Sequence, residues 1–230
     1  MHITRLHLLA HDFEAQRRFY AETLGFAVVA DSATTLTIAI GDSQLHLIDA
    51  RAAGNAAHAP AHFAFNIPYD QVLVAKAWLG ARTPLLADRA GRSDFHNETF
   101  ASHQIYFRDP DGNIGELIGR ARLPASVGEP FTAATAVRGL SEIGLAVSDV
   151  STAVRGYREA FGPSRYGAEP GADFAAVGDD DGMLIVVRAG RIWFPDTGIP
   201  AEPLWLEAEL RANERAHRLA GPPYRVLPIP

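Results

Sequence analysis

The sequence contains no cysteine and almost no lysine. The absence of cysteine over 230 residues excludes disulfide bonds, thiolate metal ligands and cysteine nucleophiles. The 21 basic residues include a single lysine, Lys76, and they form no run, while the formal net charge is −6. A nucleic acid or an anionic membrane surface is therefore a poor candidate partner.

Long apolar runs are missing as well. No stretch is apolar for long enough to cross a bilayer. Residues 1–16 mix charged and apolar side chains, which is unlike a signal peptide, so we expect a cytoplasmic protein. Hydrophobic residues make up 47% of the chain and charged residues 21%. These proportions indicate an ordinary globular protein with a sizeable core, in one large domain or two of usual size.

A repeat relates two parts of the chain. Residues 11–26 (HDFEAQRRFYAETLGF) align without gaps with residues 148–163 (SDVSTAVRGYREAFGP), and the same offset of 137 aligns Gly41 with Gly178. The repeated unit starts with an alternating strand and continues with a helix. It closes with three strands that turn residues separate. We therefore interpret the unit as a β-α-β-β-β module.

The helix of the first module has both end signals. Asp12 is expected to cap its N-terminus, and Gly25 is expected to end it. A second copy of the module fits residues 61–119, and a third fits residues 139–188. A shortened fourth copy is expected to consist of a strand, a helix and a strand, over residues 203–210, 211–221 and 224–229.

The composition also predicts a division of the chain. Residues 121–137 are rich in proline, alanine and glycine, which is typical of a linker. We therefore predict an N-terminal module pair at residues 1–120 that carries the candidate site, and a C-terminal pair at residues 138–230 that is degenerate and structural.

Two segments carry a resemblance to a known family. They are YFRDPDGNIGEL (106–117), with its DPDG turn, and the strand HFAFNIP (62–68). With the four modules, they resemble the vicinal oxygen chelate superfamily, which includes glyoxalase I, extradiol dioxygenases, fosfomycin-resistance transferases and bleomycin-binding proteins. The resemblance implies an α+β fold of tandem βαβββ modules paired into cup-shaped mixed sheets, with the fourth module truncated.

The resemblance also implies a divalent metal at the base of the cup. Glu116, an acid inside an otherwise apolar strand, matches the family's glutamate ligand, and His62 matches the first-strand histidine of a second module. Strand alternation allows His7 and His46 to face the same cavity. Three imidazoles and one carboxylate suit Fe, Mn, Zn, Ni or Co.

The first module departs from the family pattern. Arg5 stands where the first-strand ligand usually sits, while His7 lies two residues further along the same face. Either His7 or His46 would then complete the site. A guanidinium does not bind metal, so Arg5 is expected to bind an anionic part of a substrate, or to pair with Glu116 in a metal-free cup.

Two residues are candidates for acid–base catalysis. Tyr106 lies ten residues before Glu116, a spacing that resembles the active-site tyrosine of extradiol dioxygenases, although a core aromatic residue in a hairpin fits the same position. His103 lies three residues before Tyr106, so in a regular strand at most one of them faces the cup. No role is expected for the remaining histidines, which are His2, His11, His58, His96 and His217.

The C-terminal half lacks the candidate ligands. The offset of 137 takes Arg5 to Glu142, His7 to Gly144 and His46 to Met183. No histidine occurs near Pro203, where a counterpart of His62 would lie. The C-terminal pair is therefore not expected to reproduce the site.

Two kinds of function remain open. The first is a divalent-metal-dependent enzyme, glyoxalase-like or extradiol-dioxygenase-like, that acts on a small substrate with neighbouring oxygens. The alternative is a metal-free protein of the bleomycin-resistance type that binds a drug or aromatic compound. Transfer of a thiol to an epoxide is a third, weaker option. The expected partner is a small molecule, and the protein is expected to be a monomer or a homodimer.

Overall fold

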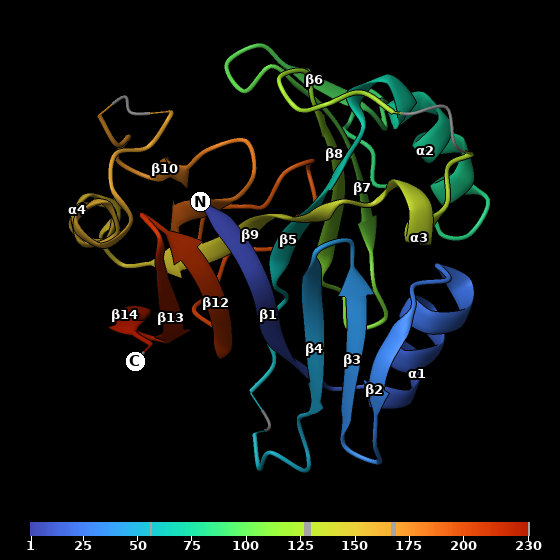
Figure 1. Cartoon of the computed structure of the whole chain (residues 1–230), viewed down its shortest axis with the longest axis horizontal. Coiled ribbons are helices and arrows are strands. Elements are labelled where there is room, and N and C mark those ends of the chain that lie inside the picture. Colours follow the sequence, from blue (N-terminus) through green and yellow to red (C-terminus); the bar gives the residue numbers. More distant parts are fainter. Residues whose placement is uncertain (56, 127–129, 167–168, 230) are drawn as a thin grey trace.

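The computed structural model describes residues 1–55, 57–126, 130–166 and 169–229. Over these ranges, 14 strands form one open mixed sheet, and a few short helices lie against it (Figure 1). The strands are β1 (His2–Ala10), β2 (Val28–Asp31), β3 (Thr35–Ile40), β4 (Ser43–Asp49), β5 (His62–Ile67), β6 (Phe95–Asn97), β7 (Ser102–Arg108), β8 (Ile114–Arg120), β9 (Gly139–Val147), β10 (Phe174–Gly178), β11 (Met183–Arg188), β12 (Leu206–Ala212), β13 (Arg215–Gly221) and β14 (Arg225–Pro228).

One helix follows the first strand of each of the first three modules, and the short α3 precedes β9. The helices are α1 (Phe13–Arg17) with its π-helical continuation η1 (Arg18–Thr23), the 3-10 turn η2 (Tyr69–Gln71) with α2 (Val72–Gly80), the short α3 (Ala133–Ala136) and α4 (Val150–Phe161). No helix in the described ranges is long and apolar enough to cross a membrane.

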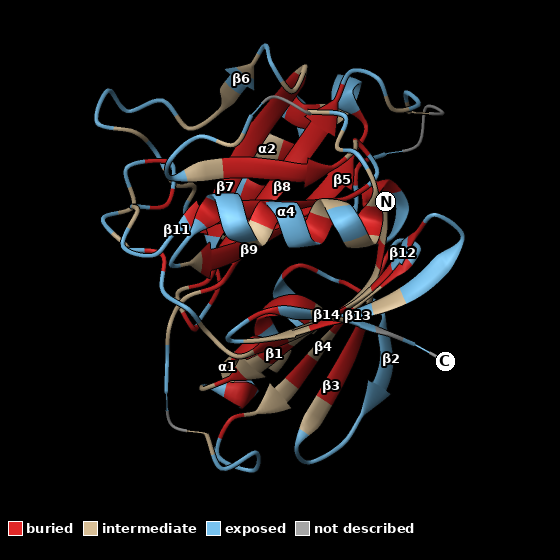
Figure 2. Cartoon of the chain, turned by 90° about the vertical axis from the view of Figure 1, so that its left-hand side faces the viewer, coloured by how far each residue is buried: buried red, intermediate tan, exposed pale blue. Residues whose placement is uncertain are grey.

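The sheet has two halves. The terminal half has the strand order β2-β3-β4-β1-β12-β13-β14, and the central half has the order β6-β7-β8-β5-β9-β11-β10. A bridge between Ile3 of β1 and Leu140 of β9 joins them. Figure 2 shows the halves one above the other, each with its own buried layer. The tandem modules and the mixed α+β sheets agree with the predicted fold class.

The pairing of modules differs from the prediction that neighbours in sequence would pair. β5 pairs antiparallel with β9, so the second module pairs with the third. β1 pairs antiparallel with β12, so the first module pairs with the C-terminal strands (Figure 1). The central half is therefore built from modules on both sides of the predicted linker, and the third module contributes directly to its interior.

The C-terminal segment contains no helix in its described residues. Residues 211–221, predicted to be helical, form the end of β12, a tight turn and β13. Asn213 and Glu214 both have positive φ, at 50° and 61°, and lie between the paired residues Ala212 and Arg215. A two-residue turn with positive φ at both positions is the geometry that closes a β-hairpin, and it overrides the helix propensity of the segment.

The helix ends agree with the sequence signals. The side chain of Asp12 accepts a hydrogen bond from the backbone N–H of Ala15 at 3.1 Å, and Asp149 caps α4 in the same way. Gly25 and Gly162, with φ of 72° and 86°, follow the two helices. In α4 the buried residues recur on one face, which gives the alternating colours of that helix in Figure 2.

The predicted linker is partly packed. Residues 127–129 lie outside the described residues, but Phe131 is buried, and its ring meets Trp78 of α2 edge to face with centroids 5.2 Å apart. The division at residues 120 and 138 stays a prediction.

The turn between β7 and β8 joins the two halves. Both carboxylate oxygens of Asp111 accept backbone N–H groups, from His11 and from Asp12, at 2.8 Å each. Asp109 is also buried and accepts the hydroxyl of Tyr20 at 3.0 Å. The DPDG segment therefore fixes the start of α1 to the turn that precedes β8, the strand that contains Glu116.

Candidate functional site

A cavity of about 410 Å³ opens on the central half of the sheet. Its walls are mainly aromatic, from both modules of that half and from the segment after β11. Three of its ionisable lining residues come from three adjacent strands: His62 on β5, Glu116 on β8 and Glu142 on β9. His96 and Arg191 line it as well. The aromatic lining residues are Phe95, Phe100, Tyr106, Phe174, Trp193 and Phe194.

These three ionisable side chains converge and are all buried. The Nε2 atom of His62 lies 3.6 Å from Oε2 of Glu116 and 3.7 Å from Oε2 of Glu142. One donor atom from each residue lies within 4.8 Å of the other two. We call His62, Glu116 and Glu142 the buried triad. The strand pairing explains the convergence, because Ala64 lies opposite both Glu116 and Glu142.

The other ring nitrogen of His62 fixes its tautomer. Nδ1 lies 3.1 Å from the backbone carbonyl oxygen of Ile114. Because a carbonyl only accepts, Nδ1 carries the proton, and in the neutral ring the lone pair is on Nε2. That lone pair then faces two carboxylates, an arrangement that calls for a cation or an additional proton between them.

A buried arginine adjoins the triad. Arg120, at the end of β8, is fully buried and bonds Oε1 of Glu142 through Nη2 at 2.5 Å. It also donates to the hydroxyl of Ser141 at 3.1–3.2 Å, whereas its Nη1 has no hydrogen-bond partner in the structure. Arg120 therefore neutralises one carboxylate and keeps Oε2 of Glu142 turned toward His62.

The pKa values of the two carboxyl groups are shifted in opposite directions. Burial, followed by the proximity of Glu142, raises the pKa of Glu116 well above its ordinary value. Burial also acts on Glu142, but the proximity of His62 and the charge and hydrogen bond of Arg120 outweigh it and lower the pKa of that carboxyl. Burial, reinforced by the charge of Glu116, raises the pKa of Tyr106 well above its usual value, so this hydroxyl stays protonated and hydrogen-bonds Glu116.

The triad fits a divalent ion. Two ligand atoms that each lie about 2.1 Å from one ion are at most about 4.2 Å apart, so separations of 3.6 and 3.7 Å leave room for an ion between the donors. One imidazole nitrogen and two carboxylate oxygens form a suitable donor set for a transition metal. The Arg120 guanidinium reduces the negative charge of the site but occupies the other oxygen of Glu142.

Arg5, His7 and His46 lie elsewhere. His7 and His46 are paired across β1 and β4 in the terminal half, with ring centroids 5.0 Å apart. Arg5 donates to Gln44 at 2.6 Å, and both Arg5 and His7 approach Glu209 of β12. The expectation that both histidines share one cavity with His62 and Glu116 is therefore wrong. Alternation gave the correct face of each strand, but β1 belongs to the other half of the sheet.

Tyr106 and His103 lie on opposite faces of β7. Tyr106 is opposite Glu116 in the strand register and lines the cavity. His103 instead lies 3.1 Å from Asp94, stacked on His96 with ring centroids 3.8 Å apart. Tyr106 is thus the member of the predicted acid–base pair that adjoins the triad.

Glu142 and Arg120 are the site residues that the sequence analysis missed. Glu142 was identified as the counterpart of Arg5, but it was set aside because the C-terminal half was expected to be separate. Arg120 shares a strand face with Glu116, four residues earlier, and that alternation was the available signal.

Comparisons with known proteins agree with this architecture. The family model described as "Glyoxalase/Bleomycin resistance protein/Dioxygenase superfamily" matches residues 2–117. No curated protein matches the chain. A candidate dioxygenase from Bacillus subtilis shares 16% identity over 81% of this chain and 63% of its own, with a TM-score of 0.57.

Two shorter structures match about half of the chain. A lactoylglutathione lyase from Agrobacterium tumefaciens shares 23% identity over 51% of this chain and 92% of its own, with a TM-score of 0.44. A glyoxalase-related enzyme from Fulvimarina pelagi shares 20% identity over 60% of this chain and 99% of its own, with a TM-score of 0.43. Because the family model spans half of the sequence, the chain belongs to the glyoxalase/bleomycin resistance protein/dioxygenase superfamily.

Proposed function

We propose that this protein is a divalent-metal-dependent enzyme in which the buried triad holds the ion. The observation that supports the proposal is the convergence of one imidazole nitrogen and two carboxylate oxygens on a cavity wall. The second ring nitrogen of His62 is held by a backbone carbonyl, which is the usual outer-shell support of a metal-binding histidine. When bound, the ion supplies Lewis-acid polarisation of substrate oxygens.

The cavity favours a small aromatic substrate with neighbouring oxygens. Aromatic side chains make up much of its lining and offer stacking surfaces. Two buried polar atoms on lining residues have no hydrogen-bond partner in the structure: Nε1 of Trp193, a donor, and Oε1 of Gln104, an acceptor. Both can bond polar groups of a substrate, since such buried atoms are costly when unpaired.

The chain's own residues have distinct tasks in this proposal. Tyr106 stays protonated and donates to Glu116, which orients that carboxylate. Arg120 orients Glu142 and balances its charge. The donor set holds one histidine and two carboxylates, where the sequence had indicated His62 with His7, His46 or both, and the single carboxylate of Glu116. This richer oxygen content favours manganese among the metals considered, and weakens the argument for iron and dioxygen chemistry.

One feature supports a second candidate, a metal-free binding protein. If Glu116 carries its proton, as its raised pKa favours, Arg120 alone balances the charge of Glu142. The cavity would then bind an aromatic ligand without chemistry, and the triad would be a neutral polar cluster in its wall.

Metal content distinguishes the two candidates. Untagged protein, purified without chelator and then offered Mn²⁺, Fe²⁺, Ni²⁺ or Zn²⁺, is expected to bind an equivalent that Glu116→Gln and His62→Ala both lose. Glu207→Gln and His7→Ala are matched controls, because both residues lie in the terminal half and should leave that equivalent in place. Loss of activity toward catechols or hydroxycarbonyl compounds should follow loss of the metal.

Equal metal content in wild type, Glu116→Gln and His62→Ala would contradict the proposal. Failure of the wild type to take up any of the four ions would favour the binding protein. In that case, quenching of tryptophan fluorescence by aromatic ligands should persist in Glu116→Gln.

A further inference from the structure

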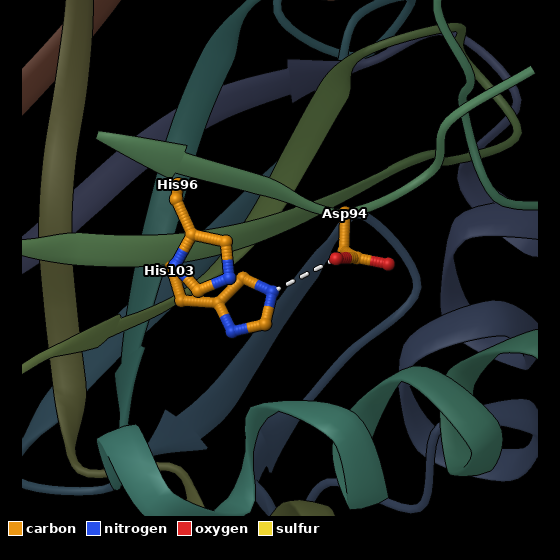
Figure 3. Close-up of side chains that lie close together, drawn as sticks. All are labelled: Asp94, His96 and His103. Atoms are coloured by element: carbon orange, nitrogen blue, oxygen red, sulfur yellow. Dashed lines mark hydrogen bonds and ion pairs between the residues drawn. The ribbon is translucent and has the colours of Figure 1, made fainter.

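A second cluster of side chains that could hold a metal lies beside the cavity, and one of its members, His96, is also a lining residue of the cavity. Asp94 precedes β6, His96 lies within β6, and His103 lies in β7 (Figure 3). One donor atom from each residue lies within 4.8 Å of the other two. His96 is exposed, Asp94 is half-buried and His103 is buried, so an ion can reach the cluster from solvent on the side of His96.

The cluster is separate from the buried triad. On β7, Gln104 and Tyr106 line the cavity, and side chains of a strand alternate between its two faces. His103 therefore points away from the cavity, toward η2 and α2. The ring centroids of His103 and Tyr69 of η2 lie 6.4 Å apart, and Lys76 of α2 donates a hydrogen bond to Asp94. The sheet itself lies between the two groups of ligands.

The donor geometry suits a transition metal. Oδ1 of Asp94 lies 3.1 Å from Nε2 of His103. At an ion about 2.1 Å from both atoms, the oxygen–metal–nitrogen angle would be near 95°. His96 and His103 are paired across the strands and stacked with near-parallel rings, so the exposed His96 ring has to turn out of the stack to aim a nitrogen lone pair at the same ion. Two nitrogens and one carboxylate oxygen are a set that zinc, nickel, cobalt and copper accept.

Lys76 supports the carboxylate without blocking it. Its ammonium bonds Oδ2 of Asp94, whereas Oδ1 faces His103. A bond to the second oxygen of a ligating carboxylate is the kind of outer-shell contact that orients metal ligands. Lys76 is the only lysine of the chain and is placed here.

We propose that Asp94, His96 and His103 form a second site for a divalent transition metal, independent of the buried triad and of the function proposed for it. The ion replaces the proton on Nε2 of His103 and links β6 to β7 at their open end. The opposite face of the same hairpin carries Phe95, whose ring contacts Phe194 and Tyr106 at 4.7 and 5.9 Å in the cavity wall. Metal at this site therefore stiffens one wall of the cavity.

Zinc and cobalt binding tests the proposal. Untagged, chelator-treated protein is titrated with Zn²⁺ by equilibrium dialysis, and with Co²⁺ by its visible absorption. In a Glu116→Gln background, His96→Ala should lower the remaining Zn²⁺ affinity by at least about tenfold and remove the corresponding Co²⁺ band. The His96 side chain is exposed, so the substitution should leave the thermal unfolding temperature of the metal-free protein unchanged.

His2→Ala is the matched control, since His2 is also accessible but lies in β1. Asp94→Asn provides a second disabling variant. The proposal is overturned if the Glu116→Gln protein binds no Zn²⁺ or Co²⁺, if His96→Ala and Asp94→Asn bind as tightly as their parent, or if His2→Ala loses as much as His96→Ala. Loss of the triad equivalent alone leaves this second site intact, so the two proposals fail separately.

Discussion

At the scale of single residues, Glu116 explains why an acid stands inside a buried strand. Its neighbours on the same face of β8 are apolar except Arg120, and its carboxyl meets Tyr106, His62 and Glu142. An isolated carboxylate would be too costly in such a place, so it must be protonated, bonded or bound to a cation. Each of these three neighbours therefore bears on whether the Glu116 carboxyl is protonated, hydrogen-bonded or bound to a cation.

The raised pKa of Glu116 predicts a pH-dependent effect of Glu116→Gln in metal-free protein. The folded-state pKa lies above the unfolded value, so stability from this group is fully present below the unfolded pKa and is lost as pH rises toward the folded pKa. Glutamine does not titrate. Relative to wild type, the variant should gain roughly 1.4 kcal/mol at pH 8 for each pKa unit of the shift, and little at pH 4.

Urea denaturation at both pH values, with EDTA present, measures this difference. An equal stability difference between variant and wild type at pH 4 and pH 8 would contradict the prediction. Glu207→Gln serves as the comparison, because Glu207 pairs with Arg218 at the edge of the terminal half.

A strand pattern and the family motif coincided at His62 and Glu116, whose role as metal ligands stays a prediction. His62 and Glu116 were both found and are adjacent in the structure. Glu142 could not be found by the same route, because its position depends on which strands pair, and strand alternation carries no information about partners. The same gap led to the inclusion of His7 and His46, whose faces were correct but whose neighbours were not.

At the scale of elements, the turn at residues 109–113 is held by a dense set of polar contacts. Asp109 accepts backbone N–H groups from Asp111 and Asn113 at 3.0 Å, as well as the Asn113 amide at 2.8 Å. Asp111 in turn holds the start of α1. The DPDG sequence predicted a turn, but its role as a connection between the halves depends on backbone groups that no sequence pattern marks.

Asp111→Ala is therefore expected to destabilise the protein by roughly 3 kcal/mol. The substitution removes two charge-assisted hydrogen bonds and leaves the N–H groups of His11 and Asp12 without their acceptor. Chemical denaturation measures the change. Glu159→Ala, on the exposed face of α4, should change stability by less than about 0.5 kcal/mol, and an effect of that size for Asp111→Ala would contradict the prediction.

The C-terminal hairpin shows why an element type can be mispredicted. The residues of 211–221 include good helix formers, and the segment is long enough for a helix. Yet alternate residues of β12, from Leu206 to Ala212, are buried. This period of two gives a strand one face that packs against the core. Tertiary packing against β1 decides the outcome, and Asn213 was the single local sign of a turn.

At the scale of the whole molecule, the fold class was predicted and the assembly of the modules was not. Three strand–helix patterns in series are visible in the sequence. Their pairing is decided by contacts between distant strands. Ala64 of β5 lies opposite Glu142 of β9, about 80 residues later, and Arg5 of β1 lies opposite Glu209 of β12, about 200 residues later. Such pairings leave no local trace in a single sequence.

Removal of residues 204–230 tests the importance of the outer pairing. The deletion takes away β12, β13 and β14, so β1 keeps its pairing with β4 but loses its other neighbour and becomes an edge strand. We expect a lower unfolding temperature and concentration-dependent association, because an exposed strand edge recruits other chains. Light scattering and thermal unfolding measure both. A monomer with unchanged stability would show that the outer pairing contributes little.

The pairing of β1 with β12 also sets the order of events during synthesis. β1 is synthesised before the strands of the central half, and its neighbour β12 is synthesised after them. The central half can form before β1 pairs with β12. Completion of the terminal half then requires closure of a loop of about 200 residues. Folding should therefore be slow and stepwise, with the cavity formed before the first strand of the chain is fully paired.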